Sequence, residues 1–284
     1  MMDAAINRSG SESVMILGCG YVGRPMAQYW RSQELTVTGT TTTPDRLAEL
    51  ADCCDRALCL RGDDEAGLRS ALAGQTTLLV CLGPRRSGIY RETYLHSAQT
   101  LAQLLPELPQ LRQVIYTSSY GVYGDRGGAW VDETTPPQPT TDNGQILLET
   151  EQVLLGAARD GLAVCVFRLG GICGPGREVA DIFRSASGQG RPGSGQDWSN
   201  WIHLDDIVGA IAFARAARLS GLYNLVHDEP LTQAELLDRA FRRRGWPGVT
   251  WNSAKSAQRP YNARVSNQKL KTAGYQFRSA TIPL

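Results

Sequence analysis

Three glycines near the start of the chain have the spacing needed to hold a phosphate group. Gly18, Gly20 and Gly23 form a G-x-G-x-x-G pattern in "VMILGCGYVGRPM", after an apolar run and before a stretch of helical length. The first glycine permits a tight turn, the second lets the backbone approach a pyrophosphate, and the third lets helix and strand pack closely. Amides of this turn, including those of Tyr21 and Val22, would face the anion together with the positive end of the helix. We therefore predict a dinucleotide-binding turn, and the alternative is a glycine-rich turn without a ligand.

The end of the next strand indicates which dinucleotide would bind. The stretch "GTTTTPDR" has no carboxylate between residues 40 and 43, where an acid would grip a ribose 2′-hydroxyl. The hydroxyls of Thr41 and its threonine neighbours, with the cation of Arg46, could hold a 2′-phosphate instead. We predict NADP as the cofactor, and NAD stays open because Asp45 could turn toward the ribose.

Later strand ends supply further candidate cofactor contacts. Asp63 in "RGDDE" is a candidate to contact the adenine amino group. Leu82 and Gly83 in "CLGP" end the fourth strand, where a small residue lets the backbone pass along the cofactor. Ser118 ends the fifth strand and completes the predicted cofactor-binding set.

Several side chains in the second half could move protons or hold a substrate. His203 in "WIHLDD" titrates near neutrality and is a candidate base, or else it anchors the helix that we expect to begin with Asp205 as N-cap. Arg177 could clamp a phosphate or carboxylate, or pair on the surface with a nearby acid. Trp198 and Trp201 could form a wall over a substrate cleft or belong to the core.

The remaining titratable residues are expected to do little chemistry. We expect Glu149 and Glu151 to face solvent on an amphipathic helix, His96 to be packed or on the surface, and His227 to be exposed in a loop. A Ser–His–Asp hydrolase is disfavoured because the chain lacks a G-x-S-x-G elbow around its serine.

Strands and helices alternate through the first 170 residues. This alternation predicts an α/β fold with a doubly wound parallel sheet, because parallel strands need helical crossovers. Residues 1–12 read as a disordered tail, 13–170 as a nucleotide-binding domain, and 171–284 as a substrate lobe with segments that return to the first domain. The glycine-rich residues 187–200 read as a mobile loop, and Thr232 with Glu235 forms a capping box. Six runs are expected as strands and five as helices: "VMILG", "LTVTGT", "RALCL", "TLLVCLG", "RQVIYTSS" and "AVCVFRLG", with helices at 21–33, 44–52, 64–73, 88–105 and 144–158.

Composition narrows the class of protein. The 284 residues carry 29 Lys and Arg against 28 Asp and Glu, so nothing in the net charge favours nucleic acid or a membrane surface as partner. The seven cysteines are an odd number, several in apolar runs, which suits reduced thiols in a cytoplasmic protein. No C-x-x-C pair occurs and no histidine lies near Cys53, Cys54 and Cys59, so we expect no metal site. We also expect no signal peptide and no membrane-spanning segment.

The chain resembles the extended short-chain dehydrogenases/reductases, and among them the NAD-dependent epimerase/dehydratase family with its small-lobed atypical members. The resemblance covers residues 14 to about 280 and rests on the order and spacing of five motifs. They are "GCGYVG", "VIYTSSYGVYGD", "FRLGGICGPGR", "WIHLDDI" and "GLYNLVHDEP". It implies a Rossmann-like sheet, a bound nicotinamide cofactor and a small-molecule substrate under the C-terminal lobe, and the helices at 88–105 and 144–158 would allow a homodimer like those of the family.

The resemblance also exposes a departure. It implies that Ser119 hydrogen-bonds the reacting oxygen of the substrate, and that a Tyr and a Lys four residues later carry the proton chemistry. Asn143 and Leu147 stand at those positions. An acid/base of that kind contributes roughly 10² to 10⁴ in rate, so its loss is serious. Tyr123 is a possible substitute, although the resemblance makes it mostly architectural.

Two hypotheses follow. The first is an NAD(P)-dependent oxidoreductase of the epimerase/dehydratase type acting on a small carbonyl or nucleotide-sugar-like substrate, with Ser119 polarising the oxygen and Tyr123, His203 or water moving the proton. The second is a non-catalytic NADP(H)-binding sensor. The intact serine turn and the "GICGPGR" segment favour the enzyme.

Overall fold

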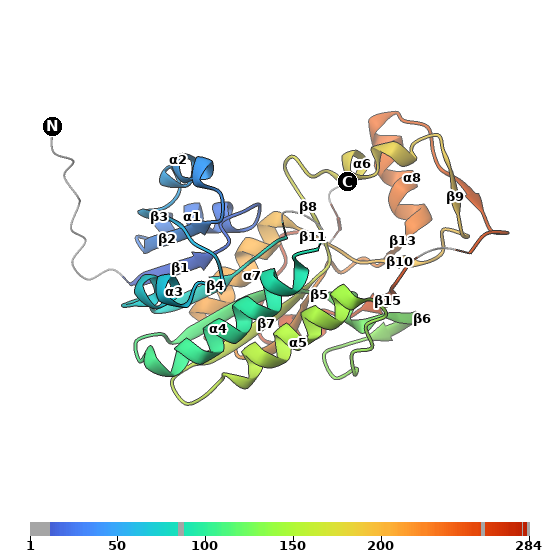
Figure 1. The fold of residues 1–284 in the computed structure, drawn as a ribbon. Coiled ribbons are helices and arrows are strands. Elements are labelled where there is room, and N and C mark those ends of the chain that lie inside the picture. Colours follow the sequence, from blue (N-terminus) through green and yellow to red (C-terminus); the bar gives the residue numbers. More distant parts are fainter. Residues whose placement is uncertain (1–11, 85–87, 257–258, 280, 283–284) are drawn as a thin grey trace. The chain divides into compact units, whose positions relative to one another are not determined.

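The computed structural model describes residues 12–84, 88–256, 259–279 and 281–282 (Figure 1). The predicted tail at 1–12 therefore lies outside the described residues, except for Glu12. The chain forms two compact units. Unit 1 contains Met1–Tyr116, Gln152–Cys165 and Ala214–Ser220, and unit 2 contains Thr117–Glu151, Val166–Phe213 and Gly221–Leu284. The single boundary predicted at residue 170 remains a prediction.

A seven-stranded sheet is the main architectural feature. Its strand order is β12-β7-β5-β4-β1-β2-β3, and β1 pairs in parallel with both β2 and β4. Chain order reverses at β1, which is the mark of a doubly wound sheet. The predicted α/β class is therefore confirmed. The bounds are β1 Ser13–Leu17, β2 Thr36–Thr41, β3 Arg56–Cys59, β4 Thr77–Val80, β5 Gln113–Ser119, β7 Ala163–Leu169 and β12 Gly221–Leu225.

The strands lie where the apolar runs predicted them. Val14, Met15 and Ile16 are fully buried. Strands covered on both faces must be apolar almost throughout, and this is the pattern that made them recognisable in the sequence.

The helices of unit 1 match the predicted segments with shorter ends. They are α1 Gly23–Ser32, α2 Leu47–Ala51, α3 Glu65–Leu72 and α4 Ser97–Leu104, with 3-10 turns at Pro44–Arg46 and Leu105–Glu107. The predicted helix at 88–105 contains a π-helical turn at Glu92–His96 before α4. Helix α1 buries Met26, Ala27 and Trp30 on one face, as an amphipathic helix covering a sheet should.

Unit 2 contains several small two-stranded sheets. Parallel pairs form between β6 Asp125–Val131 and β15 Asn262–Val265, between β8 Gly171–Cys173 and β11 Trp201–His203, and between β9 Gly190–Pro192 and β14 Thr250–Asn252. Strand β10 Trp198–Ser199 pairs antiparallel with β13 Leu231–Thr232. The stretch 187–200, predicted as a loop, therefore contains two short strands. Their partners lie far along the chain, so local composition could not reveal them.

The helices of unit 2 are α6 Val179–Ile182, α7 Leu204–Ala216, α8 Gln233–Arg244 and α9 Gln268–Thr272, with 3-10 turns at Tyr120–Tyr123 and Arg184–Ala186, and α5 Asp142–Gly156 runs through both units. Helices α5, α7 and α8 begin close to their predicted starts, and the short helices α6 and α9 were not predicted. The predicted capping box is confirmed at α8, where Thr232 and Glu235 exchange hydrogen bonds. The predicted N-cap at Asp205 is wrong, because α7 begins at Leu204 and Asp205 is the second residue of its first turn.

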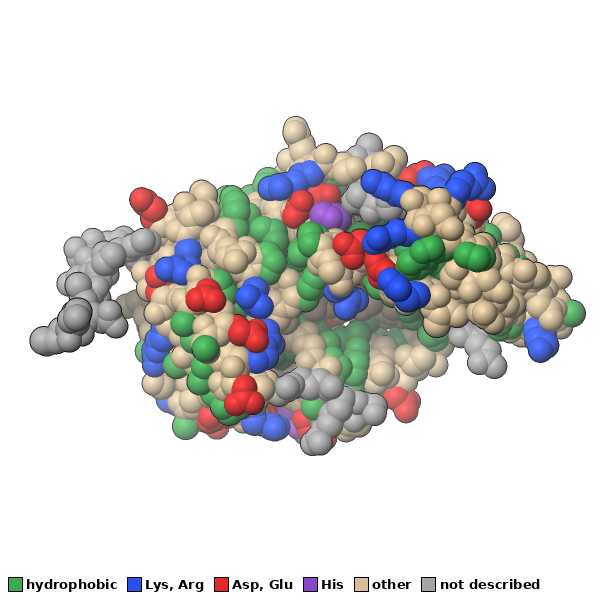
Figure 2. All heavy atoms as spheres, turned by 90° about the horizontal axis from the view of Figure 1, so that it is seen from above, with side chains coloured by type: hydrophobic (Ala, Val, Ile, Leu, Met, Phe, Trp, Pro, Cys, Tyr) green, Lys and Arg blue, Asp and Glu red, His purple; other side chains and the backbone are tan. Residues whose placement is uncertain are grey.

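Surface charge agrees with the near-neutral composition. On the face drawn in Figure 2, the Lys and Arg side chains are interspersed with Asp and Glu. Among the described residues, no helix is both long and apolar enough to cross a membrane.

Candidate functional site

The glycine turn after β1 has the geometry that each of its glycines predicts. Gly18 has φ of 95°, and a Cβ there would lie 2.7 Å from the carbonyl oxygen of Cys81. A Cβ on Gly23 would lie 2.7 Å from the carbonyl oxygen of Gly18, so helix and turn pack too closely for any side chain. A Cβ on Gly20, by contrast, would meet nothing within 4 Å. The open side of the turn is therefore at Gly20, where a pyrophosphate would approach.

Strand β2 holds this turn in place. The hydroxyl of Thr40 accepts the Gly18 amide at 2.9 Å, and the Thr40 carbonyl accepts the Cys19 amide at 2.8 Å. Thr40 is buried, so its hydroxyl serves the turn and does not face a ligand. The Thr41 hydroxyl accepts the amide of Thr43 at 3.1 Å and likewise shapes the strand end.

Two cations gather beyond β2. Arg46 lies 3.3 Å from the carboxylate of Glu49, and Arg24 of α1 lies 3.5 Å from the same carboxylate oxygen. Sequence reasoning singled out Arg46 and missed Arg24. The sequence could have indicated Arg24, because it lies in the first turn of α1, directly after the glycine turn. Both guanidinium groups are partly exposed and could exchange Glu49 for a ligand phosphate.

Asp63 and Leu82, also predicted to contact the cofactor, already hydrogen-bond to other protein groups, whereas Gly83 is open. Asp63 accepts two hydrogen bonds from Arg61 at 2.9 and 2.8 Å, and this pairing holds the pKa of its carboxyl below the ordinary value. The carbonyl of Leu82 accepts the hydroxyl of Tyr94 at 3.2 Å. Gly83 is exposed and open, since a Cβ there would meet nothing within 4 Å.

Ser119 ends β5 in unit 2 at the start of a 3-10 turn. Its Oγ accepts the amide of Gly121 at 3.1 Å, so the hydroxyl hydrogen is left to donate elsewhere. Its neighbour Ser118 is different, because its hydroxyl is buried and donates to Glu151 at 2.5 Å.

A buried ion pair supports this turn. Glu151 accepts hydrogen bonds from Nε and Nη2 of Arg168, the shorter at 2.7 Å, and the side chains are 1% and 3% exposed. The expectation that Glu151 faces solvent is therefore wrong. The helix turns this residue toward β7, where Arg168 lies on a strand whose other residues are apolar.

Tyr123 lies inside the same network. Its ring is fully buried under the Arg168 guanidinium, which is 4.6 Å from the ring centroid. Its hydroxyl donates toward the Asp132 carbonyl at 2.8 Å and Oδ1 of Asn224 at 2.9 Å. Burial raises the pKa of Tyr123, and Arg168 opposes that rise. These contacts describe an architectural residue.

The two positions that depart from the resembled family lie on α5. Asn143 is exposed, and Leu147 is buried. Neither side chain can exchange a proton, so any proton transfer must use other residues or water.

An aromatic pair that sequence reasoning missed lies beside the Ser119 turn. The rings of Tyr120 and Tyr261 meet edge to face with centroids 5.2 Å apart. The Tyr261 ring packs on the turn itself, because a Cβ on Gly121 would lie 3.7 Å from it. The Arg259 guanidinium lies 5.3 Å from the centroid of the Tyr261 ring. Burial raises the pKa of Tyr120 to about 12, and Arg259 opposes the rise. No local pattern marked Tyr261, since only tertiary folding brings it to the turn.

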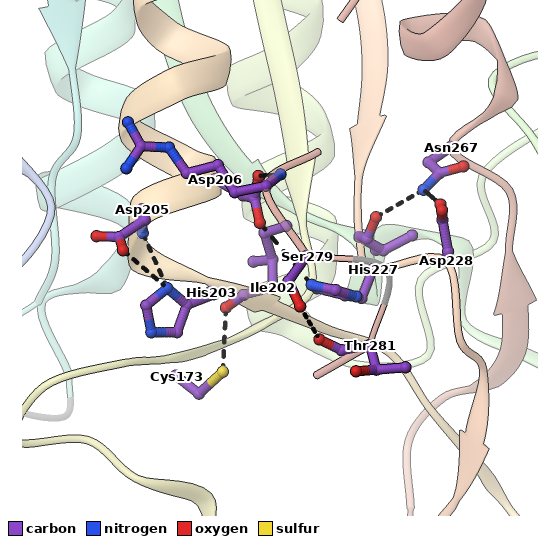
Figure 3. A network of polar contacts seen from close by, with 12 residues as sticks. Cys173, Ile202, His203, Asp205, Asp206, His227, Asp228, Asn267, Ser279 and Thr281 are labelled. Carbon is purple, nitrogen blue, oxygen red and sulfur yellow. Dashed lines mark hydrogen bonds and ion pairs between the residues drawn. The ribbon is translucent and has the colours of Figure 1, made fainter. Parts of the chain in front are cut away.

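The two histidines of unit 2 have structural contacts (Figure 3). Nδ1 of His203 accepts the amide of Asp205 at 3.2 Å and lies 3.6 Å from its carboxylate, so the imidazole caps α7. His227 is only 5% exposed, which overturns the expectation of an exposed loop histidine. Its Nε2 lies 3.8 Å from Asp206, a buried carboxylate that also accepts from the hydroxyl of Tyr275.

The predicted substrate residues separate into two environments. Trp201 is buried in a core cluster with Phe183, at a ring distance of 6.0 Å, so it belongs to the core. Trp198 is partly exposed and stacks with Arg264, whose guanidinium is 5.0 Å from its ring. Arg177 is exposed.

Known proteins identify the class. Residues 14–225 match the NAD dependent epimerase/dehydratase family, and the chain belongs to that family. The predicted resemblance is thereby confirmed.

Individual relatives agree with this assignment. Protein YeeZ of Escherichia coli K12 is 35% identical over 221 residues, covering 75% of this chain and 77% of YeeZ. A functionally unknown conserved protein from Silicibacter pomeroyi has a structure with a TM-score of 0.78 at 27% identity, covering 95% of each chain. The dTDP-glucose 4,6-dehydratase DesIV of Streptomyces venezuelae, solved with NAD and TYD bound, has a TM-score of 0.78 at 18% identity and covers 94% of this chain and 92% of its own, so it supports the fold alone.

Proposed function

We propose that the protein is an NADP(H)-dependent oxidoreductase of the epimerase/dehydratase type. The observation that carries the proposal is the glycine turn. The Thr40 hydroxyl accepts the Gly18 amide of this turn. The turn has no room for a side chain at Gly18 or Gly23, and it is unobstructed at Gly20. A turn with those three properties fits a pyrophosphate, and the family to which the chain belongs is NAD dependent.

The chain has residues to hold such a cofactor along unit 1. The glycine turn takes the pyrophosphate, and the partly exposed Arg46 and Arg24 take the 2′-phosphate in exchange for Glu49. When bound, the nicotinamide supplies hydride transfer. The proposed cofactor-binding residues of unit 1 are Gly18, Gly20, Tyr21, Val22, Gly23, Thr41, Arg46, Asp63, Leu82 and Gly83, to which Arg24 is added. Ser118 belongs to unit 2, and its cofactor contact stays a prediction.

Unit 2 supplies the proposed polar chemistry. Ser119 donates its hydroxyl hydrogen to the carbonyl oxygen of the substrate while its Oγ keeps the Gly121 amide. Tyr261 is the proposed proton donor because it packs on this turn and is partly exposed, whereas the hydroxyl of Tyr123 is held by two acceptors, the Asp132 carbonyl and Oδ1 of Asn224. His203, whose Nδ1 is engaged, remains a candidate through Nε2.

The proposed substrate is a small carbonyl compound or a nucleotide sugar. A dTDP-sugar enzyme among the structural neighbours supports the second class by fold only. Arg177 is the proposed clamp for an anionic group and Trp198 the proposed stacking surface, whereas Trp201 belongs to the core.

Calorimetry tests the cofactor assignment. We expect Arg46→Ala to weaken NADPH binding about tenfold or more, since a lost charged contact of about 1.4 kcal/mol has that effect, and to leave NADH binding nearly unchanged. Arg69→Ala on α3, far along the chain from the turn, is the matched control. Equal weakening of both dinucleotides would remove Arg46 from the 2′-phosphate site.

Turnover tests the enzyme assignment. NADPH oxidation is followed against a panel of aldehydes, ketones and nucleotide sugars with wild type, Ser119→Ala and Tyr261→Phe. We expect Ser119→Ala to abolish measurable turnover and Tyr261→Phe to lower kcat about 10²-fold. His203→Gln and Tyr123→Phe are compared in the same assay. Activity that survives in Ser119→Ala would contradict the proposed role of Ser119 as hydrogen-bond donor to the substrate.

A second candidate function is an NADP(H) sensor without turnover. It is favoured by Asn143 and Leu147, which occupy the acid/base positions of the resembled family. Tight NADPH binding with no turnover on any substrate of the panel would support the sensor over the enzyme.

A further inference from the structure

Three buried cysteines from two chain segments meet: Cys19 belongs to the glycine turn, and the adjacent Cys53 and Cys54 follow α2. Sγ of Cys54 lies 3.9 Å from Sγ of Cys19 and 3.8 Å from Sγ of Cys53, and all three sulfurs lie within 4.8 Å of one another. The three residues are 2%, 1% and 4% exposed for Cys19, Cys53 and Cys54. Sequence spacing gave no sign of this cluster, because Cys19 belongs to the glycine turn and the other two follow α2.

The surrounding backbone is arranged to admit these sulfurs. Gly39 of β2 faces them, and a Cβ there would lie 2.4 Å from Sγ of Cys54 and 3.3 Å from Sγ of Cys19. The amide of Cys19 is fixed by the Thr40 carbonyl, and the amides of Cys53 and Cys54 both donate to the Leu50 carbonyl. Two chain segments therefore converge beside Gly39 with their thiols inward.

The triangle of sulfurs has the dimensions of a thiolate metal site. With two sides of 3.8 and 3.9 Å and a third of at most 4.8 Å, a point equidistant from the sulfurs lies about 2.2–2.5 Å from each. A zinc–thiolate bond is about 2.3 Å long, so a metal of that size fits without large movement.

We propose that Cys19, Cys53 and Cys54 bind a single soft d10 cation, with Cu(I) favoured, through three thiolates. Soft thiolate ligands select Cu(I) or Zn(II), and structural zinc takes four ligands in nearly every case. Among the residues that the structure describes, the group that gathers here has three members only. Three-coordinate thiolate binding therefore favours the monovalent ion.

Binding requires the loss of protons and no change of oxidation state. Each thiol releases its proton as its sulfur–copper bond forms, and the copper remains Cu(I). Burial raises the pKa of the Cys53 thiol, and the hydrogen bond with Cys19 and burial raise that of Cys54, so both are protonated without a metal. The fields of Arg24 and Arg31 oppose those shifts and would stabilise the bound thiolates.

An entry route is available beside the cluster. Helix α2 has only five residues, and Ala48, Glu49 and Ala51 on it are exposed. A short helix with few buried contacts opens locally at low cost, and its opening would expose Cys53 and Cys54.

Competition for Cu(I) tests the site. The reduced full-length protein is titrated anaerobically against the Cu(I) complex of bathocuproine disulfonate, whose colour fades as copper is withdrawn. We expect wild type to take up a single equivalent. Cys19→Ala, Cys53→Ala and Cys54→Ala should each weaken uptake at least about tenfold. Cys59→Ala is the matched control, because Cys59 is an exposed cysteine at the end of neighbouring β3, and it should retain the copper.

Two results would overturn the proposal. One is no copper uptake by wild type, and the other is uptake that Cys59→Ala lowers as much as the cluster variants do. Circular dichroism checks that each variant folds. If a variant does not fold, the copper K-edge X-ray absorption spectrum of copper-loaded wild type tests the site instead. Three sulfur ligands at about 2.3 Å would support the proposal, and nitrogen or oxygen ligands would overturn it.

Discussion

At the scale of single residues, the feature with the largest desolvation cost is the buried ion pair between Glu151 and Arg168. Both side chains are almost completely buried, and Glu151 also accepts the hydroxyl of Ser118. Two charges removed from water are tolerated only when each is paired and hydrogen-bonded. The pair connects α5 to the strand end that carries Ser119, so it orients the proposed catalytic turn.

We predict that Glu151→Gln lowers the free energy of unfolding by about 3 kcal/mol, because it leaves the buried Arg168 charge uncompensated. Urea denaturation measures the change. Glu149→Gln on the same helix should change it by less than about 0.5 kcal/mol. The double variant Glu151→Gln/Arg168→Met should recover part of the loss, and a loss as large as that of the single variant would argue against charge burial as the cause.

At the scale of elements, the glycine turn depends on β2 for its shape. Glycines allow the turn, but they do not hold it, and the Thr40 hydroxyl satisfies the amide of Gly18. A hydroxyl at this position therefore contributes to stability and, in the proposed function, to cofactor affinity.

We predict that Thr40→Val destabilises the protein by about 1–3 kcal/mol, since it leaves the Gly18 amide without its acceptor. It should also weaken NADPH binding. Thr42→Val, at an exposed threonine two positions later, is the control and should be near neutral. Thermal unfolding with and without NADPH measures both effects, and equal behaviour of the two variants would contradict the anchoring role.

The capping box of α8 predicts a pH dependence. Hydrogen bonds from the Thr232 amide and hydroxyl hold the pKa of Glu235 below its ordinary value of 4.5. Its stabilising contribution is therefore complete above that ordinary value and is lost as the pH falls through the lowered folded value. We expect the stability difference between wild type and Glu235→Gln to be constant near pH 7 and to shrink below about pH 4. Denaturation at a series of pH values measures it, and a difference that grows on acidification has the wrong sign.

At the scale of the whole molecule, a hollow in unit 1 is relevant to the predicted homodimer. It is lined mainly by apolar residues, with Arg159 at one side. Ala102 of α4, Leu105 and Pro106 of the following 3-10 turn, Val153 of α5 and Ala157 just after α5 belong to the lining. The family resemblance would allow a dimer seam on these two helices, and the apolar lining is consistent with that expectation.

We predict a dimer in solution that Val153→Glu dissociates, because a carboxylate placed in an apolar seam is desolvated without a partner. Gln152→Glu, at the exposed neighbouring position, should leave the dimer intact. Sedimentation velocity distinguishes the dimer from the monomer, and a monomeric wild type would contradict the prediction.

Much of the parallel sheet was predictable from local information. Strands buried on both faces must be apolar, and the helices between them must be amphipathic, so both patterns are visible along the chain. The glycine turn and the Thr232 capping box were predictable for the same reason, because each is completed within a few residues. The strands β9 and β10 were missed because their pairing partners lie far along the chain.

The features of the candidate site likewise fall into those that depend on local sequence and those that depend on tertiary packing. The sequence alone determined the family, the glycine turn, Ser119 and the absence of an acid/base at Asn143 and Leu147, because spacing along one segment carries each of these. Only the tertiary structure decided that Glu151 and His227 are buried, that Tyr261 packs on the serine turn, and that Cys19 meets Cys53 and Cys54. The physical reason is that these properties depend on which distant segments pack together, and packing of this kind leaves no periodic pattern in the sequence.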